Sequence, residues 1–147
     1  MPGSPRLAVR AIIVENGRLL LVNAYSGGSL WCAPGGGVEM GASLSDNLAR
    51  EVWEETGLSV GVGDLVGVNE FHEPKAALHQ VDLFFRAKIR SGVLNAAWRD
   101  PDAVVTERQF FSASELSDVR FKPDMLPELA FGDPQVCRVG ALERLIR

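Results

Sequence analysis

The stretch Gly36–Leu58, GGVEMGASLSDNLAREVWEETGL, decides how the rest of the chain is interpreted. Its carboxylates at Glu51, Glu54 and Glu55 are spaced i, i+3 and i+4, so they occupy neighbouring positions on one helical face. Like charges at this spacing destabilise a helix by about 0.2–0.5 kcal/mol per pair. A hard cation such as Mg²⁺, which binds carboxylate oxygens, would relieve the repulsion. The pattern predicts a helix with a cation-binding face; a solvated, ion-paired surface helix is the alternative.

The predicted helix has a start signal at one end and a termination signal at the other. Ser43 followed by Asp46 has the spacing of a capping box, in which side-chain oxygens accept from free N–H groups of the first turn. Gly57 follows the last carboxylate and can adopt the left-handed conformation that ends helices. Leu48 and Val52, four residues apart, form an apolar stripe that predicts docking on a core.

The stretch also resembles a known sequence motif. Ahead of the helix, Pro34-Gly35-Gly36-Gly37 predicts a loop whose backbone can approach a ligand or metal closely. With this loop, the segment resembles the box of the Nudix hydrolases, in which a Gly, a Glu and an Arg-Glu-aliphatic-x-Glu-Glu-x-Gly-aliphatic run have fixed spacings. Ala42 stands where the box has its first Glu. The matching positions are Gly36, Arg50, Glu51, Val52, Glu54, Glu55, Gly57 and Leu58.

The resemblance implies a fold and a reaction. Strands on both sides of one strong helix, with a second helix late in the chain, predict an α+β layered domain. The resemblance sharpens this to a Nudix α/β/α sandwich around a mixed β-sheet, as a single domain over residues 1–147. It implies hydrolysis of a diphosphate bond in a nucleoside diphosphate linked to another moiety. ADP-ribose, a nucleotide sugar and a nucleoside triphosphate all remain candidate substrates, because selectivity lies in loops outside the box.

The resemblance also assigns roles to residues. Mg²⁺, with Mn²⁺ as the alternative, would activate water and neutralise phosphate oxygens. Arg50 would fix a glutamate through a charge-assisted hydrogen bond. The candidate bases are Glu51, Glu54 and Glu107. The expected metal ligands are Gly35, Glu51, Glu54 and Glu55, and the expected substrate contacts are Gly36, Gly37 and Trp98.

Two of these residues lie far from the box. Trp98 is in a long predicted loop over 91–105 and could cover a base or sugar; a rim aromatic or partner contact is the alternative. Glu107 lies in a predicted strand over 106–111 that resembles the Glu-x-Arg-aromatic strand of Nudix proteins. It is a candidate extra ligand or base, with an exposed strand carboxylate as the alternative.

Other periodicities indicate the remaining elements. Runs over 7–14 and 18–23 around Asn16-Gly17 predict a hairpin, and the glycine-interrupted run over 59–71 and the alternating run over 80–89 predict two strands. Residues 123–131 predict a helix begun by Pro123. The tail from 139 to 147 is mixed and predicts no element.

Composition narrows the function classes. The net charge of −4 suggests no general attraction to nucleic acid or an anionic membrane, so a small nucleotide-type substrate is the expected partner. The apolar run at 12–14 is too short for a membrane span and precedes Glu15, which argues against a secretory signal. Cys32 and Cys137 lack a zinc-site spacing, so we expect reduced thiols and a cytoplasmic location.

Two further questions are open at the level of sequence. A homodimer is an alternative to a monomer. Loss of the box's first Glu at Ala42 leaves a rival function, a catalytically weak Nudix-like domain that binds a nucleotide as a sensor or interaction module. Retention of the acidic cluster favours the enzyme.

Overall fold

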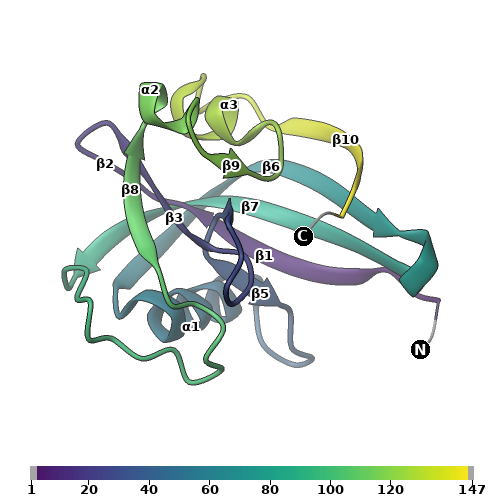
Figure 1. Cartoon of the computed structure of the whole chain (residues 1–147), viewed down its shortest axis with the longest axis horizontal. Helices are drawn as coiled ribbons and strands as arrows, with labels where there is room; N and C mark the ends of the chain where they lie inside the picture. Colours follow the sequence, from purple (N-terminus) through teal and green to yellow (C-terminus); the bar gives the residue numbers. More distant parts are fainter. Residues whose placement is uncertain (1–2, 146–147) are drawn as a thin grey trace.

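The computed structural model describes residues 3–145 and is built from two β-sheets and short helices (Figure 1). The strands are β1 (Arg6–Ile12), β2 (Val14–Glu15), β3 (Arg18–Asn23), β4 (Leu30–Cys32), β5 (Gly35–Gly37), β6 (Ser59–Glu73), β7 (Leu78–Ser91), β8 (Arg108–Ser112), β9 (Arg120–Phe121) and β10 (Arg138–Arg144). The helices are α1 (Leu44–Thr56), α2 (Ala113–Leu116), α3 (Leu126–Phe131) and the 3₁₀ turn η1 (Pro74–Ala76). None of these helices has the length and apolar character that crossing a membrane requires.

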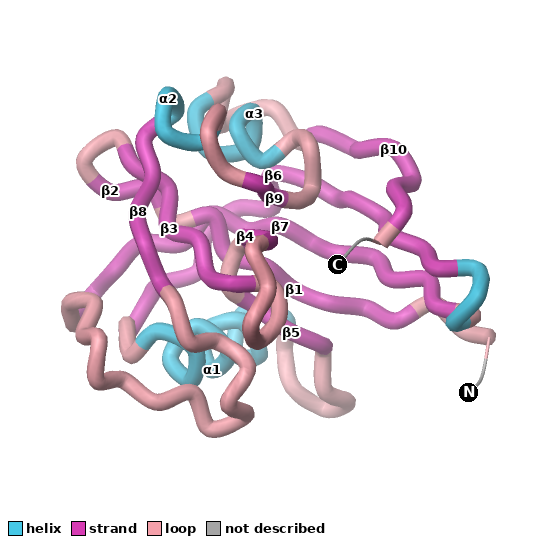
Figure 2. Tube along the Cα trace, viewed as in Figure 1, coloured by secondary structure: helices cyan, strands magenta, loops and turns pink. Residues whose placement is uncertain are grey.

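The larger sheet is mixed. Its strand order is β10-β6-β7-β1-β5, with β1 parallel to β7, β10 parallel to β6, and the β6–β7 and β1–β5 pairs antiparallel. The smaller sheet has the order β2-β3-β4-β9, and β8 pairs with β3. Helix α1 lies on one side of the strands and α2 and α3 lie on the other (Figures 1 and 2). The predicted α+β class and sandwich around a mixed sheet are confirmed.

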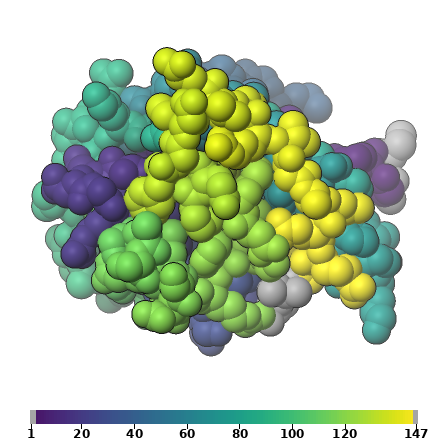
Figure 3. Space-filling view, turned by 90° about the horizontal axis from the view of Figure 1, so that it is seen from above, coloured from purple at the N-terminus to yellow at the C-terminus, as the bar shows by residue number. Residues whose placement is uncertain are grey.

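Two apolar clusters hold these layers together. Under α1, Leu48 and Val52 are fully buried against Val9 and Ala11 of β1. On the other side, Phe84 of β7 packs in a cluster that also contains residues of α2 and α3. Seen from that side, the part of the chain from α2 onward covers much of the molecule's face (Figure 3). Because strand side chains alternate between faces, each of the two sheets contributes residues to both clusters.

The predicted ends of α1 are confirmed. The Ser43 side chain accepts from the N–H of Asp46 at the start of the helix. Gly57 ends it with φ of 75°, and its N–H donates to the carbonyl of Trp53. The predicted hairpin is also present: Asn16 and Gly17 both have positive φ between β2 and β3, as a two-residue hairpin turn of this sequence requires.

The C-terminal part departs from the sequence predictions. Helix α3 starts at Leu126 rather than at Pro123, and the proline in its first turn is Pro127. Both prolines satisfy the preference for the first turn, so the pattern alone could not choose between them. Residues 138–144, for which no element was predicted, form edge strand β10. Val139 and Leu142 in this strand are exposed, so the strand lacks the buried alternation from which strands are recognised.

Candidate active site

Two carboxylates of α1 meet the glycine strand β5. The N–H of Gly35 donates to Oε1 of Glu55 at 3.0 Å. A Cβ at Gly36 would stand 2.6 Å from the carboxylate carbon of Glu51, and a Cβ at Gly35 would stand 2.0 Å from the carbonyl oxygen of Val9. The φ of Gly35 is +154°, at the limit of the region that favours glycine. The missing side chain at Gly36 therefore lets the Glu51 carboxylate approach β5, and the missing side chain at Gly35 lets β5 lie close to the backbone of β1.

These carboxylates open onto a cavity. It has a volume of about 330 Å³ and is walled by β1, β5, α1 and the loop before β8. We call it the carboxylate cavity. The backbone of Gly35–Gly37 forms part of its wall. Its charged wall residues are Arg6, Arg10, Glu51, Glu55, Asp100 and Asp102. The structure thus gathers predicted residues of the box with charged residues from two other parts of the chain.

Arg50 pairs with carboxylates of α1 and of the preceding loop. Its guanidinium donates to both carboxylate oxygens of Glu54 at 3.1 and 3.2 Å, and to Glu51 at 3.3 Å. A further ion pair joins it to Glu39 at 3.4 Å. Glu54 does not line the carboxylate cavity. Within residues 3–145, no three His, Cys, Asp or Glu side chains are grouped so that they could hold a metal ion in this conformation.

The chemistry of the remaining donors nevertheless fits a divalent cation. Burial raises the pKa of the Glu55 carboxyl to about 8, against the opposing effects of Arg10 and the Gly35 N–H. Burial also raises the pKa of Glu51, and Arg50 opposes that rise. A bound cation would favour the charged form of both groups. Two carboxylates beside the backbone of Gly35 offer hard oxygen donors of the kind that Mg²⁺ binds.

Arg10 is a site residue that the sequence reasoning missed. Its guanidinium donates to the carbonyls of Ala33 and Gly35 at 3.2 and 3.4 Å, and it lies 3.8 Å from the buried carboxylate of Asp82. These contacts fix the loop that leads into β5. The available signal was a charged residue within the apolar run over 7–14, where an arginine must be paired when it is buried.

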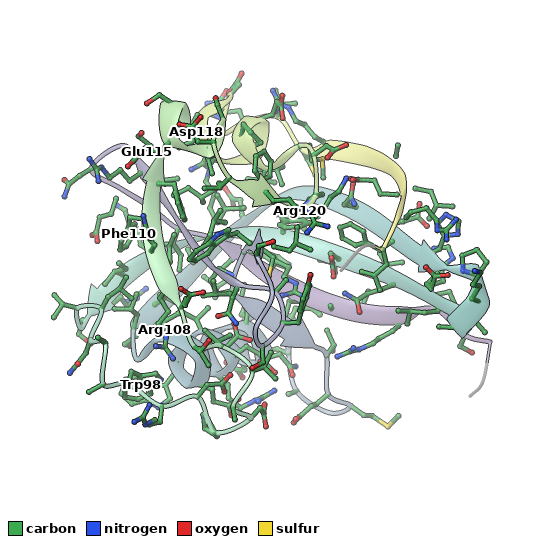
Figure 4. The ribbon with its side chains drawn as sticks, viewed as in Figure 1. Trp98, Arg108, Phe110, Glu115, Asp118 and Arg120 are labelled. Atoms are coloured by element: carbon green, nitrogen blue, oxygen red, sulfur yellow. The ribbon has the colours of Figure 1, made fainter. Side chains whose placement is uncertain are left out.

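Asp100 was also missed, and it shapes the loop before β8. Its carboxylate is buried and accepts from the backbone N–H groups of Asp102, Val104 and Val105 at 3.0, 3.3 and 2.8 Å. Arg108 then joins this loop to the helix, because it donates to the carbonyls of Glu55 and Val105. Figure 4 shows Arg108 at the start of β8, above the loop. The loop is thereby held against the end of α1 and brings Asp102 to the cavity.

Trp98 lies at the C-terminal end of α1. Its indole N–H donates to the carbonyl of Glu54 at 2.8 Å, and its ring meets that of Trp53 edge to face at 5.0 Å. A Cβ at Gly57 would stand 2.8 Å from the same ring. Figure 4 shows Trp98 in the loop below Arg108. Trp98 is not among the residues that line the carboxylate cavity, and its contacts join the loop to the helix.

From these contacts we expect Trp98→Ala to act on stability. A half-buried indole, its hydrogen bond and its aromatic pair should together be worth about 2–3 kcal/mol of the free energy of unfolding. Urea unfolding measures this quantity. Trp98→Phe should recover about half of the loss, because the ring contact survives. A large rise in KM with unchanged stability would instead assign Trp98 to substrate binding.

Glu107 stands at the entrance to β8. Its backbone is fixed by Asn23, whose side-chain oxygen accepts from the Glu107 N–H at 2.9 Å and whose N–H donates to the Glu107 carbonyl at 3.2 Å. The residue is exposed and is not among those that line the carboxylate cavity. Of the candidate bases, Glu51 is therefore the one on the cavity wall.

The loop around Ala42 is closed by a buried amide. Asn47 accepts from the N–H of Glu39 at 3.0 Å and donates to the carbonyls of Ala42 and Ser43 at 3.2 and 2.8 Å. Its side chain is 1% exposed, whereas Ala42 is exposed. The β5–α1 loop is thus anchored by Asn47, and Glu39 is the loop carboxylate that pairs with Arg50.

This arrangement predicts different effects for two loop variants. Asn47→Ala removes three hydrogen bonds to the loop backbone and a longer one from Arg50 at 3.5 Å. It should lower the free energy of unfolding by about 2–3 kcal/mol, at about 1 kcal/mol for each backbone contact. Ala42→Glu adds a carboxylate at an exposed position near Arg50 and should change stability by less than about 0.5 kcal/mol. We expect this variant to bind Mg²⁺ as well as the parent chain or more tightly. Chemical unfolding and Mg²⁺ titration check both expectations, and a large loss of Mg²⁺ affinity in Ala42→Glu would contradict the second.

Several proteins have sequences similar to that of this chain. The chain is 36% identical over 106 residues to a MutT-like protein of Streptomyces ambofaciens, covering 67% of this chain and 66% of that protein. It is 31% identical over 121 residues to an ADP-ribose pyrophosphatase of Methanocaldococcus jannaschii, covering 80% and 68%. It is 31% identical over 71 residues to the phosphatase NudJ of Escherichia coli, covering 48% and 46%. The matched region thus spans about half to two thirds of these relatives.

Solved structures show the same fold. A UDP-X diphosphatase superposes with a TM-score of 0.72 at 24% identity, covering 93% of this chain and 68% of that one. A Nudix hydrolase from Nitrosomonas europaea superposes with a TM-score of 0.71 at 23% identity, covering 84% of each chain. The model of the NUDIX domain matches residues 4–130, which includes β1, the glycine strand and the whole of α1. The chain therefore belongs to the Nudix hydrolase family.

Proposed function

We propose that this chain hydrolyses a diphosphate bond in a nucleoside diphosphate linked to another moiety, with Mg²⁺ or Mn²⁺ as cofactor. The observation that carries the proposal is the joint placement of Glu51 and Glu55 against β5, on the wall of a cavity that also contains Arg6 and Arg10. Carboxylates suit a cation and arginines suit phosphate oxygens. A cavity that presents both can take a metal-bound diphosphate.

The family relationship supports the reaction class. Two of the related proteins are described as an ADP-ribose pyrophosphatase and a UDP-X diphosphatase. Both names describe cleavage within a diphosphate that carries a nucleoside and a second group. The two names differ in the nucleoside diphosphate, ADP in one and UDP in the other, and the second leaves the attached group open. The relationship therefore supports the reaction and leaves the substrate of this chain to experiment.

In this proposal each residue has a physical role. Glu51, Glu55 and the Gly35 carbonyl would hold the cation, which when bound supplies a Lewis acid and lowers the pKa of a water molecule. Glu51 accepts the proton of the attacking water, because it lies on the cavity wall. Arg50 orients Glu51 and Glu54 through charge-assisted hydrogen bonds.

Other residues would contact the substrate, serve as an alternative metal ligand or base, or act indirectly. The bare backbone of Gly36 and Gly37 lets phosphate oxygens approach the strand closely. Glu54 could join the ligands once its side chain leaves Arg50, and Glu107 is the alternative base. Trp98 would act indirectly, by holding the loop that carries Asp102 to the cavity.

A substrate panel tests the proposal. The full chain should be incubated with ADP-ribose, UDP-glucose, nucleoside triphosphates and a dinucleoside polyphosphate at millimolar Mg²⁺, and products should be followed by chromatography. We expect cleavage of at least one member to a nucleoside monophosphate or diphosphate and abolition by EDTA. Tight nucleotide binding without turnover on any member would favour the rival function, a catalytically weak sensor.

We also propose that residues 1–147 act as one domain in the cytoplasm. The free thiols of Cys32 and Cys137 support that compartment. A homodimer is supported by Val139 and Leu142, which are exposed on edge strand β10, because an exposed apolar edge can pair with a second copy. Light scattering on the protein as it elutes from a size-exclusion column measures its molar mass and so distinguishes a dimer from a monomer.

A further inference from the structure

A second cavity adjoins the carboxylate cavity. It has a volume of about 270 Å³ and shares four wall residues with its neighbour, Arg6, Arg10, Ala24 and Cys32. Because the two cavities share these walls, they meet at the arginines of β1. We call the second one the aromatic cavity, since Tyr25, Phe71 and Phe84 are on its walls.

The two arginines at the junction are engaged to different extents. Arg10 is bound to two backbone carbonyls and paired with Asp82. Arg6 is exposed, and within residues 3–145 no hydrogen bond or ion pair to its guanidinium is found. A Cβ at Gly37 would stand 2.6 Å from a terminal nitrogen of Arg6, so the guanidinium lies over the glycine strand. Arg6 is therefore the cation that can take an anionic group of a ligand lying across the junction.

The apolar part of the aromatic cavity's wall favours a flat aromatic ring over a sugar. Phe71 and Phe84 are 6% and 1% exposed, and Leu30 and Leu78 complete an apolar lining. Aromatic rings bury area against such walls at little cost, whereas the hydroxyls of a sugar would each need a hydrogen-bond partner. The volume is close to the lower limit, about 300 Å³, of ordinary ligand cavities, which suits a single base.

The polar side chains in this cavity offer acceptors. Nε2 of Gln80 donates to Oδ1 of Asp82 at 2.8 Å, and Arg10 approaches the same oxygen. The orientation of the Gln80 amide follows from this contact, because the flipped amide would place its oxygen against the Asp82 carboxylate. The amide oxygen of Gln80 and Oδ2 of Asp82 are thus left as acceptors. Lys122, a donor on the wall, gives two of its three N–H groups to Asp124 and Glu143.

We propose that the aromatic cavity binds the nucleobase of the substrate and selects bases that carry an exocyclic amino group, with Gln80 and Asp82 accepting from that group and Arg6 binding the phosphate next to the nucleoside. The inference rests on the proposed function for the presence of a nucleotide. It adds the class of base, amino-bearing adenine, guanine or cytosine rather than uracil or thymine. The selection follows because an oxo group would face two acceptors and leave them unpaired.

Calorimetric titration in EDTA tests this without hydrolysis. The full chain should be titrated with CMP and UMP, and with AMP and IMP, pairs that differ chiefly by an amino or an oxo group. We expect CMP and AMP to bind at least about tenfold more tightly than UMP and IMP, because an oxo group leaves the acceptors of Gln80 and Asp82 unpaired. Equal affinities within both pairs, or no binding of any monophosphate, would overturn the proposal. This comparison needs no variant.

Variants then assign the residues. Gln80→Leu should reduce the CMP preference to less than about threefold. Arg6→Gln should weaken CMP and UMP alike by about tenfold and leave cytidine unchanged, since only the phosphate contact is lost. Arg90→Gln, an exposed arginine outside both cavities, is the matched control and should change nothing. An equal effect of Arg6→Gln and Arg90→Gln would overturn the role of Arg6.

The binding titration and the substrate panel can fail independently of each other. A preference for amino-bearing bases in EDTA, without cleavage of any panel member in Mg²⁺, would reject the proposed hydrolysis and retain the base assignment. Cleavage in Mg²⁺ with equal binding of the paired monophosphates would do the reverse.

Discussion

Glu51→Gln is expected to lower kcat by about 10²- to 10⁴-fold, the usual contribution of a positioned base. The carboxylate lies on the wall of the carboxylate cavity, directly over Gly36. Glutamine keeps the volume and the hydrogen bond from Arg50, so the fold should be preserved, while the side chain can neither accept a proton nor bind a cation as strongly. Steady-state kinetics at saturating Mg²⁺, with Kd for Mg²⁺ measured separately, gives both effects.

Matched substitutions make this result specific. Glu107→Gln removes the same charge from an exposed residue outside the cavity wall, and we expect a change in kcat of less than about threefold. Glu54→Gln loses an ion pair with Arg50 and should have an intermediate effect, because Arg50 also orients Glu51. If Glu107→Gln lost about 10²-fold or more in kcat with KM unchanged, the base would be Glu107 and Glu51 would be a ligand alone.

The sequence predicted those parts of the site that lie within one local segment. The limits of α1 followed from Ser43 and Gly57, whose capping depends on neighbours a few residues away. The glycines predicted a loop that a ligand or metal approaches closely. The structure instead has strand β5 over Gly35–Gly37, and the carboxylates of Glu51 and Glu55 approach it. Helical spacing put Glu51 and Glu55 on one face, one turn apart, and both line the cavity.

The sequence could not predict contacts that depend on packing between distant segments. Helical spacing treats Glu54 like Glu51 and Glu55, but the cavity formed by several segments is lined by Glu51 and Glu55 and not by Glu54. Arg10 lies 34 residues before the start of α1 and Asp100 lies 44 residues after its end, and the fold brings both to the cavity. Trp98 has an aromatic ring suited to a base, but its partner is Trp53. Such pairings follow from tertiary structure, which overrides local preference.

Glu55→Gln is expected to change activity and stability in opposite directions. The amide oxygen can still accept from Gly35, so the link between α1 and β5 survives. A negatively charged ligand of the cation is lost, however, and kcat should fall by about 10³-fold, which corresponds to several kcal/mol of metal assistance.

Burial raises the pKa of Glu55 from 4.5 to about 8. The unfolded chain therefore releases this proton at lower pH than the folded chain does, and the contribution of Glu55 to stability falls as pH rises from about 4.5 towards 8. In EDTA the variant should thus exceed the parent chain in free energy of unfolding by about 1–2 kcal/mol at neutral pH, after allowance for solvent that reaches this half-buried side chain. Urea unfolding at pH 5 and pH 8 measures the difference, which should be smaller at pH 5. A variant less stable than the parent at both pH values would show that the charge of Glu55 stabilises the fold and that the cavity does not disfavour it.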